Sequence, residues 1–504
     1  MRIAISYPPI VNEDGQKAMV SQNRNVQFFK TPTYLLPVIQ AQAATWLRDL
    51  GHTVYWDDGN SQLKNYDQWF NDLIQFNPEL VVFESTTPVM TFYWHCIDEL
   101  KRKHPSVIVV LTGYHSMRRP QESLENSTAD IVLTSNHIDF IVPKLAAAIE
   151  NDPENWKNTI DVEGLYIRQS EGSIHNTGHF RQVEDLDKSP IVDRDLVDWK
   201  RYAYENGNFL QTPGTYASSV IRDCTFGKCT FCRYNGGDMT FSQMSVERSL
   251  DEYEKLINNY GVREIFDDSG VWFRGKEARA FAQGIIDRGL HKKGCYFGFN
   301  TRFEYLDEET IKLLAKANFR FILIGLEACD DETLQRLKKG YTVASVHKSL
   351  AWMTRYGLHP HLTVMVGYYW QTREMLDKTV TTVRDLMFKG LARTLQVTIC
   401  TPLDYTLYHQ ECISEKVLLT DNYDDHDMSK LIVKTPIPHD EYYEAIRKMY
   451  MIGFHPLFIF RQLIFLMKFR KRDWQFLFIY GWRAIRRIRN HIFNLTKNQG
   501  SEIL

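Results

Sequence analysis

Several patterns that identify common classes of protein are missing from this sequence of 504 residues. No stretch of about 18 to 20 residues is free of charged side chains, so a membrane-spanning helix is not expected. The first residues, MRIAISYPPI, lack a charged segment followed by a long apolar run, and no secretory signal is predicted. A net charge of −2 gives no reason to expect a nucleic-acid partner. We therefore expect a cytoplasmic protein.

The composition is that of a globular protein, with 44% hydrophobic and 24% charged residues. A chain of this length exceeds what one hydrophobic core accommodates, and two or three domains are expected. In residues 1–150, helical patterns separate the strand-like runs RIAISYP, HTVYWDD, ELVVFES, SVIVVLTG and ADIVLTS. Strands that are apolar on both faces predict an α/β domain in which helices cover both faces of a parallel sheet, the doubly wound arrangement.

Ligands of doubly wound sheets bind at the carboxyl ends of the strands. No G-x-G-x-x-G follows the first predicted strand, which removes the usual signal of a nicotinamide or flavin site. Small polar residues follow the later strands instead, and two interpretations are open. They either let a large flat ligand lie against the sheet edge or serve as ordinary loop and capping residues. These residues are Ser85, Thr86, Thr87, Thr112, Gly113 and Ser135.

Three further regions follow the first domain. Residues 151–205 are polar and mixed, and we expect them to form a connector. Residues 206–402 hold about six strand–helix units, beginning with the strand ASSVIRD, which predicts a partial (β/α)6 barrel. In such barrels the chemistry lies at the carboxyl ends of the strands. Residues 403–504 are expected to form a helical extension.

The helical extension contains a segment rich in basic and aromatic residues. From His455 to Asn490 it has nine Lys or Arg and one acidic residue, Asp473. One interpretation is a pair of interfacial helices that contact an anionic membrane or an apolar substrate. The other is an extension packed on the barrel, with its basic side chains lying over apolar surface.

Three of the eight cysteines lie in the nine-residue stretch CTFGKCTFC, as Cys224, Cys229 and Cys232. In a cytosolic chain such a group indicates metal ligands rather than disulfides. Structural zinc usually needs four ligands in two pairs, and a [4Fe-4S] cluster held only by protein takes four cysteines. Three thiolates leave one iron open to a substrate or cofactor. Structural zinc and a cluster that only transfers or senses electrons remain alternatives.

A group of three cysteines after the first strand of a partial barrel resembles the radical S-adenosylmethionine (SAM) enzymes. In that family the open iron binds SAM, which is reductively cleaved to a 5′-deoxyadenosyl radical that abstracts hydrogen from an unactivated carbon. The usual spacing is C-x3-C-x2-C, and this chain has one more residue between Cys224 and Cys229. Phe231 occupies the aromatic position before the third cysteine.

Further motifs resemble those that place SAM in the family. FDDSG matches the family's turn after the second barrel strand. An Arg after the third strand and the motif GLEA at the end of the fourth match the segments that lie near SAM. The resemblance implies that SAM contacts Asp267, Asp268, Ser269, Arg302, Gly325 and Glu327. In the segment MVGYYWQTREM, Gly367 and Thr372 match the family, whereas Tyr369 and Gln371 replace its usual Pro and Glu.

A doubly wound domain before such a barrel resembles the cobalamin-binding subclass of radical SAM enzymes. That group includes the anaerobic Mg-protoporphyrin ester cyclase and several C-methylases. The LTGYHS segment is similar to a turn of that domain, with His115 at the matching position, but no D-x-H-x-x-G supplies a lower ligand for cobalt. The resemblance implies that cobalamin contacts Ser85, Thr86, Thr112, Gly113, His115 and Ser135.

The resemblance as a whole implies an enzyme with a [4Fe-4S] cluster, SAM and cobalamin. It would methylate or oxidatively cyclise a small-molecule substrate that is apolar or large, with a flavodoxin or ferredoxin as electron donor. The alternatives are a non-catalytic iron–sulfur protein, a zinc-stabilised binding module, and a radical SAM enzyme whose first domain no longer binds cobalamin. Peripheral membrane contact through the basic aromatic segment is a further expectation.

Overall fold

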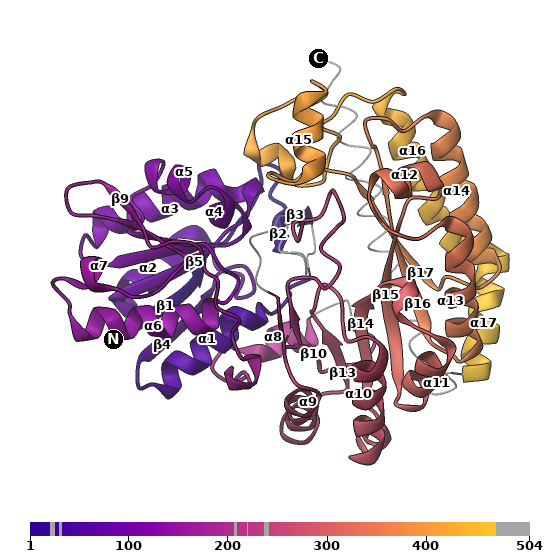
Figure 1. Ribbon diagram of the computed structural model, residues 1–504, viewed down its shortest axis with the longest axis horizontal. Coiled ribbons are helices and arrows are strands. Elements are labelled where there is room, and N and C mark those ends of the chain that lie inside the picture. Colours follow the sequence, from indigo (N-terminus) through magenta and orange to yellow (C-terminus); the bar gives the residue numbers. More distant parts are fainter. Residues whose placement is uncertain (21–25, 30–32, 206–208, 219, 236–240, 470–504) are drawn as a thin grey trace.

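The computed structural model describes residues 1–20, 26–29, 33–205, 209–218, 220–235 and 241–469, and it contains two parallel β-sheets flanked by helices (Figure 1). Two short antiparallel ribbons accompany them. One pairs β2 (Lys17–Val20) with β3 (Val26–Phe29), and the other pairs β11 (Ile221–Arg222) with β12 (Ser242–Gln243). The predicted α/β class with parallel sheets is confirmed.

The first sheet has the strand order β4-β1-β5-β6-β7-β8-β9, and its first five strands are parallel. The chain starts at β1, adds β4 on one side, and then builds the rest on the other side. The strand order therefore reverses between β1 and β5, which is where open α/β sheets bind ligands. The five strands are β1 (Arg2–Tyr7), β4 (Thr53–Asp58), β5 (Leu80–Glu84), β6 (Ile108–Thr112) and β7 (Ile131–Leu133).

Helices cover both faces of this sheet. Side chains of β1 alternate between two hydrophobic clusters: Ile3 and Ile5 pack with α1 (Val38–Asp49) and α6 (Ile138–Asn151), while Ala4 faces the other side. On that side lie α2 (Tyr66–Phe76) and α3 (Met90–Lys103). Burial on both faces explains why the strands are almost wholly apolar.

The segment predicted as a connector adds two strands to the first sheet. Strands β8 (Leu165–Arg168) and β9 (Ile174–Asn176) extend it antiparallel beyond β7. The alternating burial of β8 is that of a strand with one face on the core. The sheet therefore extends beyond residue 150, and the short helix α8 (Trp199–Tyr204) leads to the second sheet.

The second sheet consists of six parallel strands in chain order, with β10 and β17 at its edges. Because each crossover returns to the same side, the helices all lie on the outer face of the sheet (Figure 1). The strands are β10 (Gly214–Ala217), β13 (Glu264–Asp267), β14 (Tyr296–Thr301), β15 (Phe319–Glu327), β16 (His359–Val366) and β17 (Thr394–Ile399). The helices between them are α9 (Val246–Tyr260), α10 (Gly275–Asp287), α11 (Glu308–Lys316), α12 (Asp331–Arg336), α13 (Val343–Arg355) and α14 (Arg373–Phe388).

The start of this sheet differs from the prediction. The strand expected at ASSVIRD is wrong in position, because β10 ends at Ala217 and the chain then leaves the sheet. The backbone N–H of Ile221 donates to the hydroxyl of Ser269 at 3.0 Å, and the Arg222 side chain bonds to the first domain. These contacts hold residues 221–222 as the short strand β11, so the cysteines lie in a loop between β11 and β12.

The described part of the C-terminal region has three α-helices, α15 (Leu407–Ser414), α16 (His439–Met451) and α17 (Pro456–Phe469). The irregular segment 415–438 between α15 and α16 contains one short 3-10 helix, at Tyr423–His426. Helices α16 and α17 pack beside α14 on the outer side of the second sheet (Figure 1). Residues 470–504, which include most of the predicted basic aromatic segment, lie outside the described residues. Among the helices described, none alone is long and apolar enough to cross a membrane, although the bent pair of residues 439–454 and 456–469 passes that test by length and composition.

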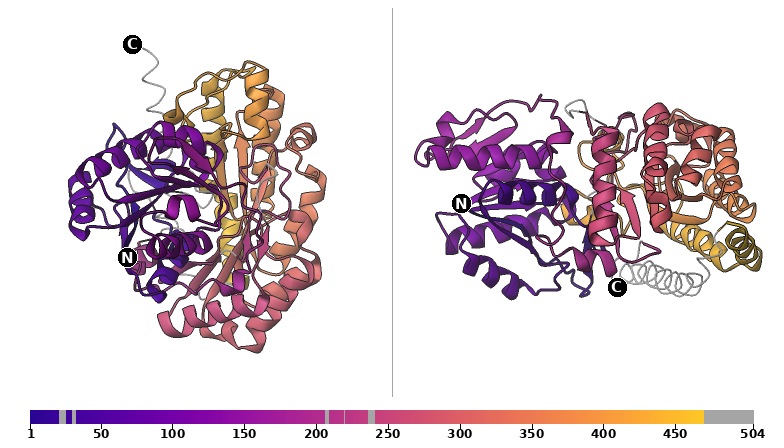
Figure 2. Two further views of the ribbon diagram at one scale, coloured as in Figure 1. Left: turned by 60° about the vertical axis from the view of Figure 1, so that its left-hand side comes forward. Right: turned by 90° about the horizontal axis from the view of Figure 1, so that it is seen from below.

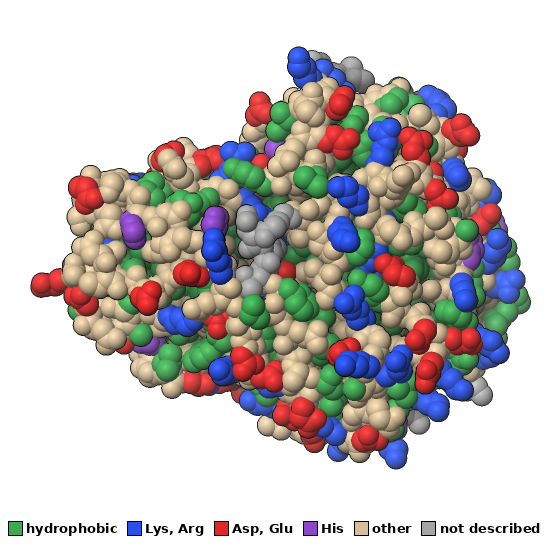
Figure 3. All heavy atoms as spheres, viewed as in Figure 1, with side chains coloured by type: hydrophobic (Ala, Val, Ile, Leu, Met, Phe, Trp, Pro, Cys, Tyr) green, Lys and Arg blue, Asp and Glu red, His purple; other side chains and the backbone are tan. Residues whose placement is uncertain are grey.

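The two sheets share a continuous apolar interior. One cluster of buried side chains runs from Ile3 and Ile131 in the first sheet to Ile265 and Ile324 in the second. Figure 2 shows the two sheets beside each other from two further directions. Charges of both signs are interspersed over the face seen in Figure 3, so no field of a single sign covers that face.

Candidate active site at the cysteine loop

The cysteine loop, residues 223–235, connects β11 to the undescribed residues that precede β12. Gly227 adopts the left-handed conformation, with φ of 55°, which lets the longer first segment turn sharply. The N–H of Cys232 donates to the carbonyl of Cys229 at 3.1 Å, and that of Asn235 to the carbonyl of Cys232 at 2.9 Å. Consecutive tight turns thus carry all three thiols on one short loop.

The thiols are partly buried and influence one another electrostatically. Burial, followed by the charge of Cys229, raises the pKa of Cys232 to about 12, and burial also raises the pKa of Cys229. Within the part of the chain that is described, no three His, Cys, Asp or Glu side chains are grouped closely enough to hold one metal ion. The donor set suits a soft metal or an iron–sulfur cluster, because three thiols occupy one loop.

Arg302, at the end of β14, joins this loop to the second sheet. Its guanidinium carbon lies 3.4 Å from the centre of the Phe226 ring, and Nη1 is 3.9 Å from the sulfur of Cys229. It also donates to the carbonyl of Lys339 and to the Glu304 carboxylate. Because the Arg302 residue is only 5% exposed, it places a fixed positive charge beside the thiols.

Glu327, at the end of β15, is held in an unusual conformation. Its φ is 60°, and the pairing of β15 with β16 shifts between Gly325 and Glu327. A Cβ on Gly325 would lie 1.9 Å from Oε1 of Glu327, so the glycine leaves room for the carboxylate in this position. Oε1 accepts from Nζ of Lys339 at 3.1 Å. The bulge therefore turns a carboxylate and its ammonium partner towards the cysteine loop, a known use of bulges near active sites.

Lys339 and Tyr341 complete this polar cluster, and neither was predicted from the sequence. Burial alone lowers the pKa of Lys339, but Tyr341 and Glu327 outweigh it and raise the pKa above its usual value. The Tyr341 hydroxyl donates to the carbonyl of Gly325. In the sequence, the only sign of them was the pair of lysines before Gly340. The sequence did not show that the loop containing these lysines folds back over β15.

The FDDSG turn after β13 divides its three predicted residues between two roles. Asp267 is fully buried, with Oδ1 accepting from the N–H of Ser269 at 2.9 Å, and burial raises its pKa to about 7. Ser269 accepts from Ile221, as described above. Asp268 alone lines a pocket. The turn therefore supports β11 through Asp267 and Ser269 and presents Asp268 to the space beside the cysteine loop.

That pocket lies between the carboxyl edge of the first sheet and the cysteine loop. Glu84, Gly113 and Asn136 line it from the first sheet, Arg233 from the cysteine loop, and Asp268 from the turn after β13 of the second sheet. The Asn136 amide donates to the Asp223 carboxylate at 2.8 Å across the boundary. The pocket thus brings residues predicted to bind cobalamin and SAM, Gly113 and Asp268, to one place.

The other residues predicted to contact cobalamin lie in the turns themselves. The Ser85 hydroxyl is 3.3 Å from that of Ser116, Thr86 precedes a short 3-10 helix, and the Ser135 hydroxyl accepts from the N–H of His137 at 3.2 Å. The Thr112 hydroxyl is buried without a hydrogen-bond partner. Gly113 is required by packing, since a Cβ would lie 2.0 Å from the carbonyl oxygen of Ser85. The Ser85 and Ser135 hydroxyls therefore have partners within the turns, whereas the Thr112 hydroxyl has none.

His115 is buried beneath the C-terminal region and does not line the pocket. Its ring centre is 4.7 Å from that of Tyr423, and Nδ1 is 3.3 Å from the hydroxyl of Thr87. Burial lowers the pKa of His115 to about 4, so the ring is neutral at pH 7. Its Nε2 has no hydrogen-bond partner.

Two ion pairs join the domains on either side of the pocket. Arg222, two residues before Cys224, makes a two-pronged contact with Asp139 of α6, with 2.8 Å between Nη2 and Oδ2. Arg119 makes a similar contact with Asp404 in the segment after β17, with 2.6 Å between Nε and Oδ2. Bidentate pairs of this kind fix orientation as well as distance.

The concave face of the second sheet has an aromatic floor. Tyr216, Phe266, Gly298, Phe321 and His359 are successive partners across five strands. A Cβ on Gly298 would lie 2.9 Å from the Phe266 ring, so the glycine lets the neighbouring rings close over it. Nearer the carboxyl ends, the same face carries partly exposed side chains of mostly uncharged character: Asn300, Leu323, His361, Thr363, Met365 and Thr398.

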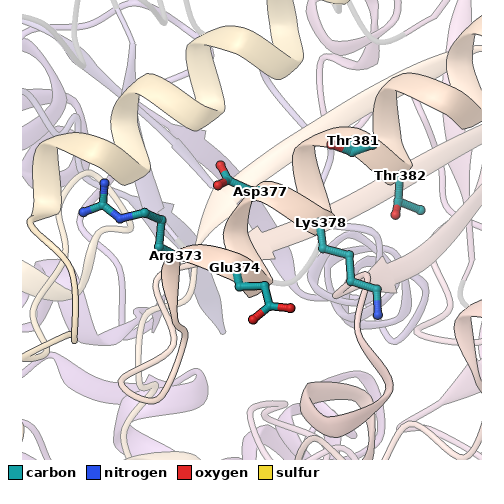
Figure 4. Close-up of a pocket in the computed structure, with 6 residues that line it drawn as sticks. All are labelled: Arg373, Glu374, Asp377, Lys378, Thr381 and Thr382. Carbon is teal, nitrogen blue, oxygen red and sulfur yellow. The ribbon is translucent and has the colours of Figure 1, made fainter.

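Gln371 has a structural role, and a second pocket lies away from the cysteine loop. Gln371, which stands where the family has Glu, is fully buried, and its side-chain oxygen accepts from the N–H of Gly367 at 2.8 Å, so it closes the turn after β16. The second pocket lies along the exposed helix α14, and none of the residues that contact the cysteine loop line it (Figure 4). Its residues are Arg373, Glu374, Asp377, Lys378, Thr381 and Thr382.

Known proteins resemble this chain over most of its length. The anaerobic magnesium-protoporphyrin IX monomethyl ester cyclase of Cereibacter sphaeroides is 26% identical over 78% of this chain. An uncharacterised methyltransferase of Pyrococcus horikoshii is 22% identical over 82% of this chain and 87% of its own length. The alignment with the cyclase covers 61% of that protein, so this chain spans about three fifths of its length.

Solved structures share the fold over most or all of the chain. The cobalamin-dependent SAM radical enzyme OxsB, solved with aqua-cobalamin and SAM, has a TM-score of 0.67 at 12% identity and covers 100% of this chain and 84% of its own. The radical SAM methyltransferase TsrM of Kitasatospora setae has a TM-score of 0.64 at 17% identity, over 82% of this chain and 76% of its own. Residues 218–383 match the radical SAM superfamily model. The chain therefore contains a radical SAM domain, and the cysteine loop lies inside it.

Proposed function

We propose that this protein is an enzyme that reductively cleaves SAM at a [4Fe-4S] cluster held by Cys224, Cys229 and Cys232. The observation that carries the proposal is the position of the three thiols at the carboxyl edge of the second sheet, beside the buried charges of Arg302, Lys339 and Glu327. When bound, the cluster supplies the electron that produces a 5′-deoxyadenosyl radical from SAM. The three thiols would hold the cluster as thiolates, so they would lose their protons when it binds.

The chain's own residues orient SAM. Glu327, paired with Lys339, provides a carboxylate for the amino group of the ligand, and Arg302 provides a positive charge for its carboxylate. Asp268 presents a second carboxylate from the pocket. Gly325 keeps the backbone of β15 open beside Glu327. Fixed charges in a partly dry site bind a zwitterionic ligand more strongly than the same charges in water.

The substrate lies, in this proposal, on the concave face of the second sheet. The row of aromatic rings closes the bottom of that face, and Leu323 and Met365 line its wall. Burial lowers the pKa of His361 to about 4, so this histidine adds no charge at pH 7. This surface favours a substrate that is large and mainly apolar, and it excludes water from the reacting carbon.

Cobalamin is proposed to lie between the sheets, at the carboxyl edge of the doubly wound domain, with the partial (β/α)6 barrel opposite. Support comes from the pocket shared by Gly113 and Asp268, and from OxsB and TsrM, which hold cobalamin in structures of similar fold. With cobalamin the proposed outcome is C-methylation or oxidative cyclisation of the substrate. TsrM is a methyltransferase and the Cereibacter sphaeroides relative is a cyclase, which supports these two classes of outcome. Flavodoxin or ferredoxin is the proposed electron donor.

Anaerobic reconstitution with iron and sulfide tests the cluster. We expect the reconstituted wild-type protein to contain about four irons per chain and to absorb visible light, and we expect Cys229→Ala to remove that absorption. Cys96→Ala, which alters a buried cysteine of α3 in the first domain, is the matched control and should retain both. Zinc bound in place of iron, or a cluster that survives Cys229→Ala, would contradict the assignment.

Incubation with hydroxocobalamin tests the second cofactor separately. After gel filtration the wild-type protein should keep the corrinoid spectrum, and Cys229→Ala should keep it too, because the two sites use different residues. Colourless wild-type protein would support the alternative in which the first domain no longer binds cobalamin.

A further inference from the structure

Exposed apolar side chains are concentrated at one place on the described surface. Seventeen large hydrophobic residues of the described chain are exposed, and seven of them fall within residues 451–467. Scattered apolar residues are normal on protein surfaces, whereas a contiguous group marks a binding surface. The seven are Met451, Phe454, Leu457, Ile459, Phe460, Ile464 and Met467.

Helix α17 is apolar on two sides. Phe458 and Phe465 face inward and are buried, and the guanidinium carbon of Arg393 lies 3.8 Å from the centre of the Phe465 ring. On the outer side, Leu457, Phe460, Ile464 and Met467 recur at spacings of three and four residues and form what we call the α17 stripe. A helix that is apolar on opposite sides needs a second apolar partner.

The charged side chains of α17 itself all have one sign. No acidic residue occurs between Glu444 and Asp473, a stretch that contains seven Lys or Arg. Arg461 and Lys468 are exposed on α17 itself. An amphipathic helix with apolar and basic side chains together binds in the plane of an anionic lipid surface, with its apolar side in the headgroup region.

The protein core holds the helix pair in place. Tyr442 and Met449 of α16 are fully buried, and the Tyr442 hydroxyl donates to the carbonyl of Gln371 at 3.0 Å. On α17, the Gln462 amide donates to the carbonyl of Arg393 at 3.0 Å. Crossing a bilayer would break these contacts, whereas contact through the α17 stripe alone keeps them.

We propose that the α17 stripe binds an anionic lipid surface and holds the enzyme at the membrane. The proposal is independent of the cofactors, because α17 lies on the outer side of the second sheet beside α14 (Figure 1). A membrane-bound enzyme would meet a lipid-soluble substrate at a raised local concentration, consistent with the apolar wall of the concave face.

Sedimentation of the full chain with vesicles tests this proposal. Wild-type protein should pellet with vesicles of phosphatidylcholine and phosphatidylglycerol, and remain in solution with phosphatidylcholine alone. The double variant Phe460→Glu/Ile464→Glu should bind at least about tenfold more weakly, since it adds charge to the stripe. The control Ile413→Glu/Leu419→Glu changes two similarly exposed residues elsewhere, 54% and 49% exposed, and should bind like wild type.

Three results would overturn the proposal. Wild-type protein that stays in solution with anionic vesicles would remove the lipid partner. Stripe and control variants that bind equally well would show that other residues make the contact. A stripe variant that lowers the melting temperature without vesicles, or converts a dimer to a monomer in light scattering, would show that the stripe is covered by this chain or by a second copy.

Discussion

Glu327 combines a left-handed backbone, a strand bulge and a buried ionic partner in one residue. Such conformations cost about 1–3 kcal/mol and persist only where the surrounding structure enforces them. Here the absence of a side chain at Gly325 and the ammonium of Lys339 together fix the carboxylate. At the scale of single residues, the site is therefore defined by a glycine as much as by its charged groups.

Substituting Gly325→Ala tests this role of glycine. The added Cβ would lie 1.9 Å from Oε1 of Glu327 and displace the carboxylate. We expect SAM affinity to fall at least about tenfold, ~1.4 kcal/mol, while the iron content stays unchanged. Isothermal titration of the reconstituted protein measures this. Gly453→Ala, where a Cβ meets no atom within 4 Å, is the control. Unchanged affinity in Gly325→Ala would remove Glu327 from the SAM site.

The buried carboxyl of Asp267 predicts a dependence of stability on pH. Burial raises its pKa to about 7, so between the unfolded pKa and about pH 7 the folded protein keeps a proton that the unfolded chain releases. This group therefore makes the protein less stable as pH rises. Asp267→Asn removes this loss of stability at higher pH. The free energy of unfolding of the variant minus that of wild type should therefore increase on the order of 1–4 kcal/mol from pH 5 to pH 8.

Denaturant unfolding of both proteins at the two pH values measures the difference. Asp161→Asn, at an exposed position, is the control and should parallel wild type. A constant difference between Asp267→Asn and wild type would show that Asp267 is ionised throughout this range.

At the residue scale, the sequence pointed to Arg302 and Glu327 but not to Lys339, which contacts Glu327. Arg302 and Glu327 do lie beside the cysteine loop. Lys339 was missed because its loop folds back over β15, and that contact depends on tertiary packing. Of the six residues predicted to contact cobalamin, Gly113 lines the pocket, whereas the Ser85 and Ser135 hydroxyls make hydrogen bonds within their turns.

Strand β11 is the element that places the cysteine loop. It is only two residues long, and its position depends on contacts outside the sheet ladder: the Ser269 hydroxyl on one side and Asp139 on the other. The Gln42 amide joins the same network, accepting from Arg222 at 3.0 Å and donating to Ser218 at 3.1 Å. The first domain therefore holds the start of the cysteine loop.

Breaking the Arg222–Asp139 pair should destabilise the protein strongly. Arg222→Gln leaves the Asp139 carboxylate buried without its charged partner, which costs about 3–5 kcal/mol. The double variant Arg222→Met/Asp139→Leu removes both charges and should recover most of that loss. Denaturant unfolding of the single and double variants gives the coupling energy. Additive effects would show that the two side chains do not depend on each other.

The strand expected at ASSVIRD shows that local sequence patterns do not reveal where contacts distant in sequence end a strand. The predicted strand covers residues 217–223, whereas the described residues are in strands only at Ala217 and at Ile221–Arg222. The break after Ala217 results from side chains distant in sequence, Asp139 and Ser269, which no local period reports. The strands of the first sheet were predictable because burial on both faces makes each a continuous apolar run.

The whole molecule is an arrangement of two mainly parallel sheets whose carboxyl edges share one pocket. Ion pairs at Arg222 and Arg119 bridge the domains on both sides of it, and a common apolar interior joins the sheets. Length and strand alternation predicted both sheets. The relative position of the domains was not predictable, because it depends on a few buried side chains far apart in sequence.

Release of 5′-deoxyadenosine tests the central claim most directly. Reconstituted wild-type protein, reduced anaerobically with SAM, should release 5′-deoxyadenosine and methionine. Cys96→Ala should match it, and Cys229→Ala should release none, because the cysteine loop then lacks one of its three cluster ligands. If wild-type protein with a full complement of iron gave no 5′-deoxyadenosine, or if Cys229→Ala produced it at the wild-type rate, the assignment of this loop as the SAM-cleaving site would be contradicted.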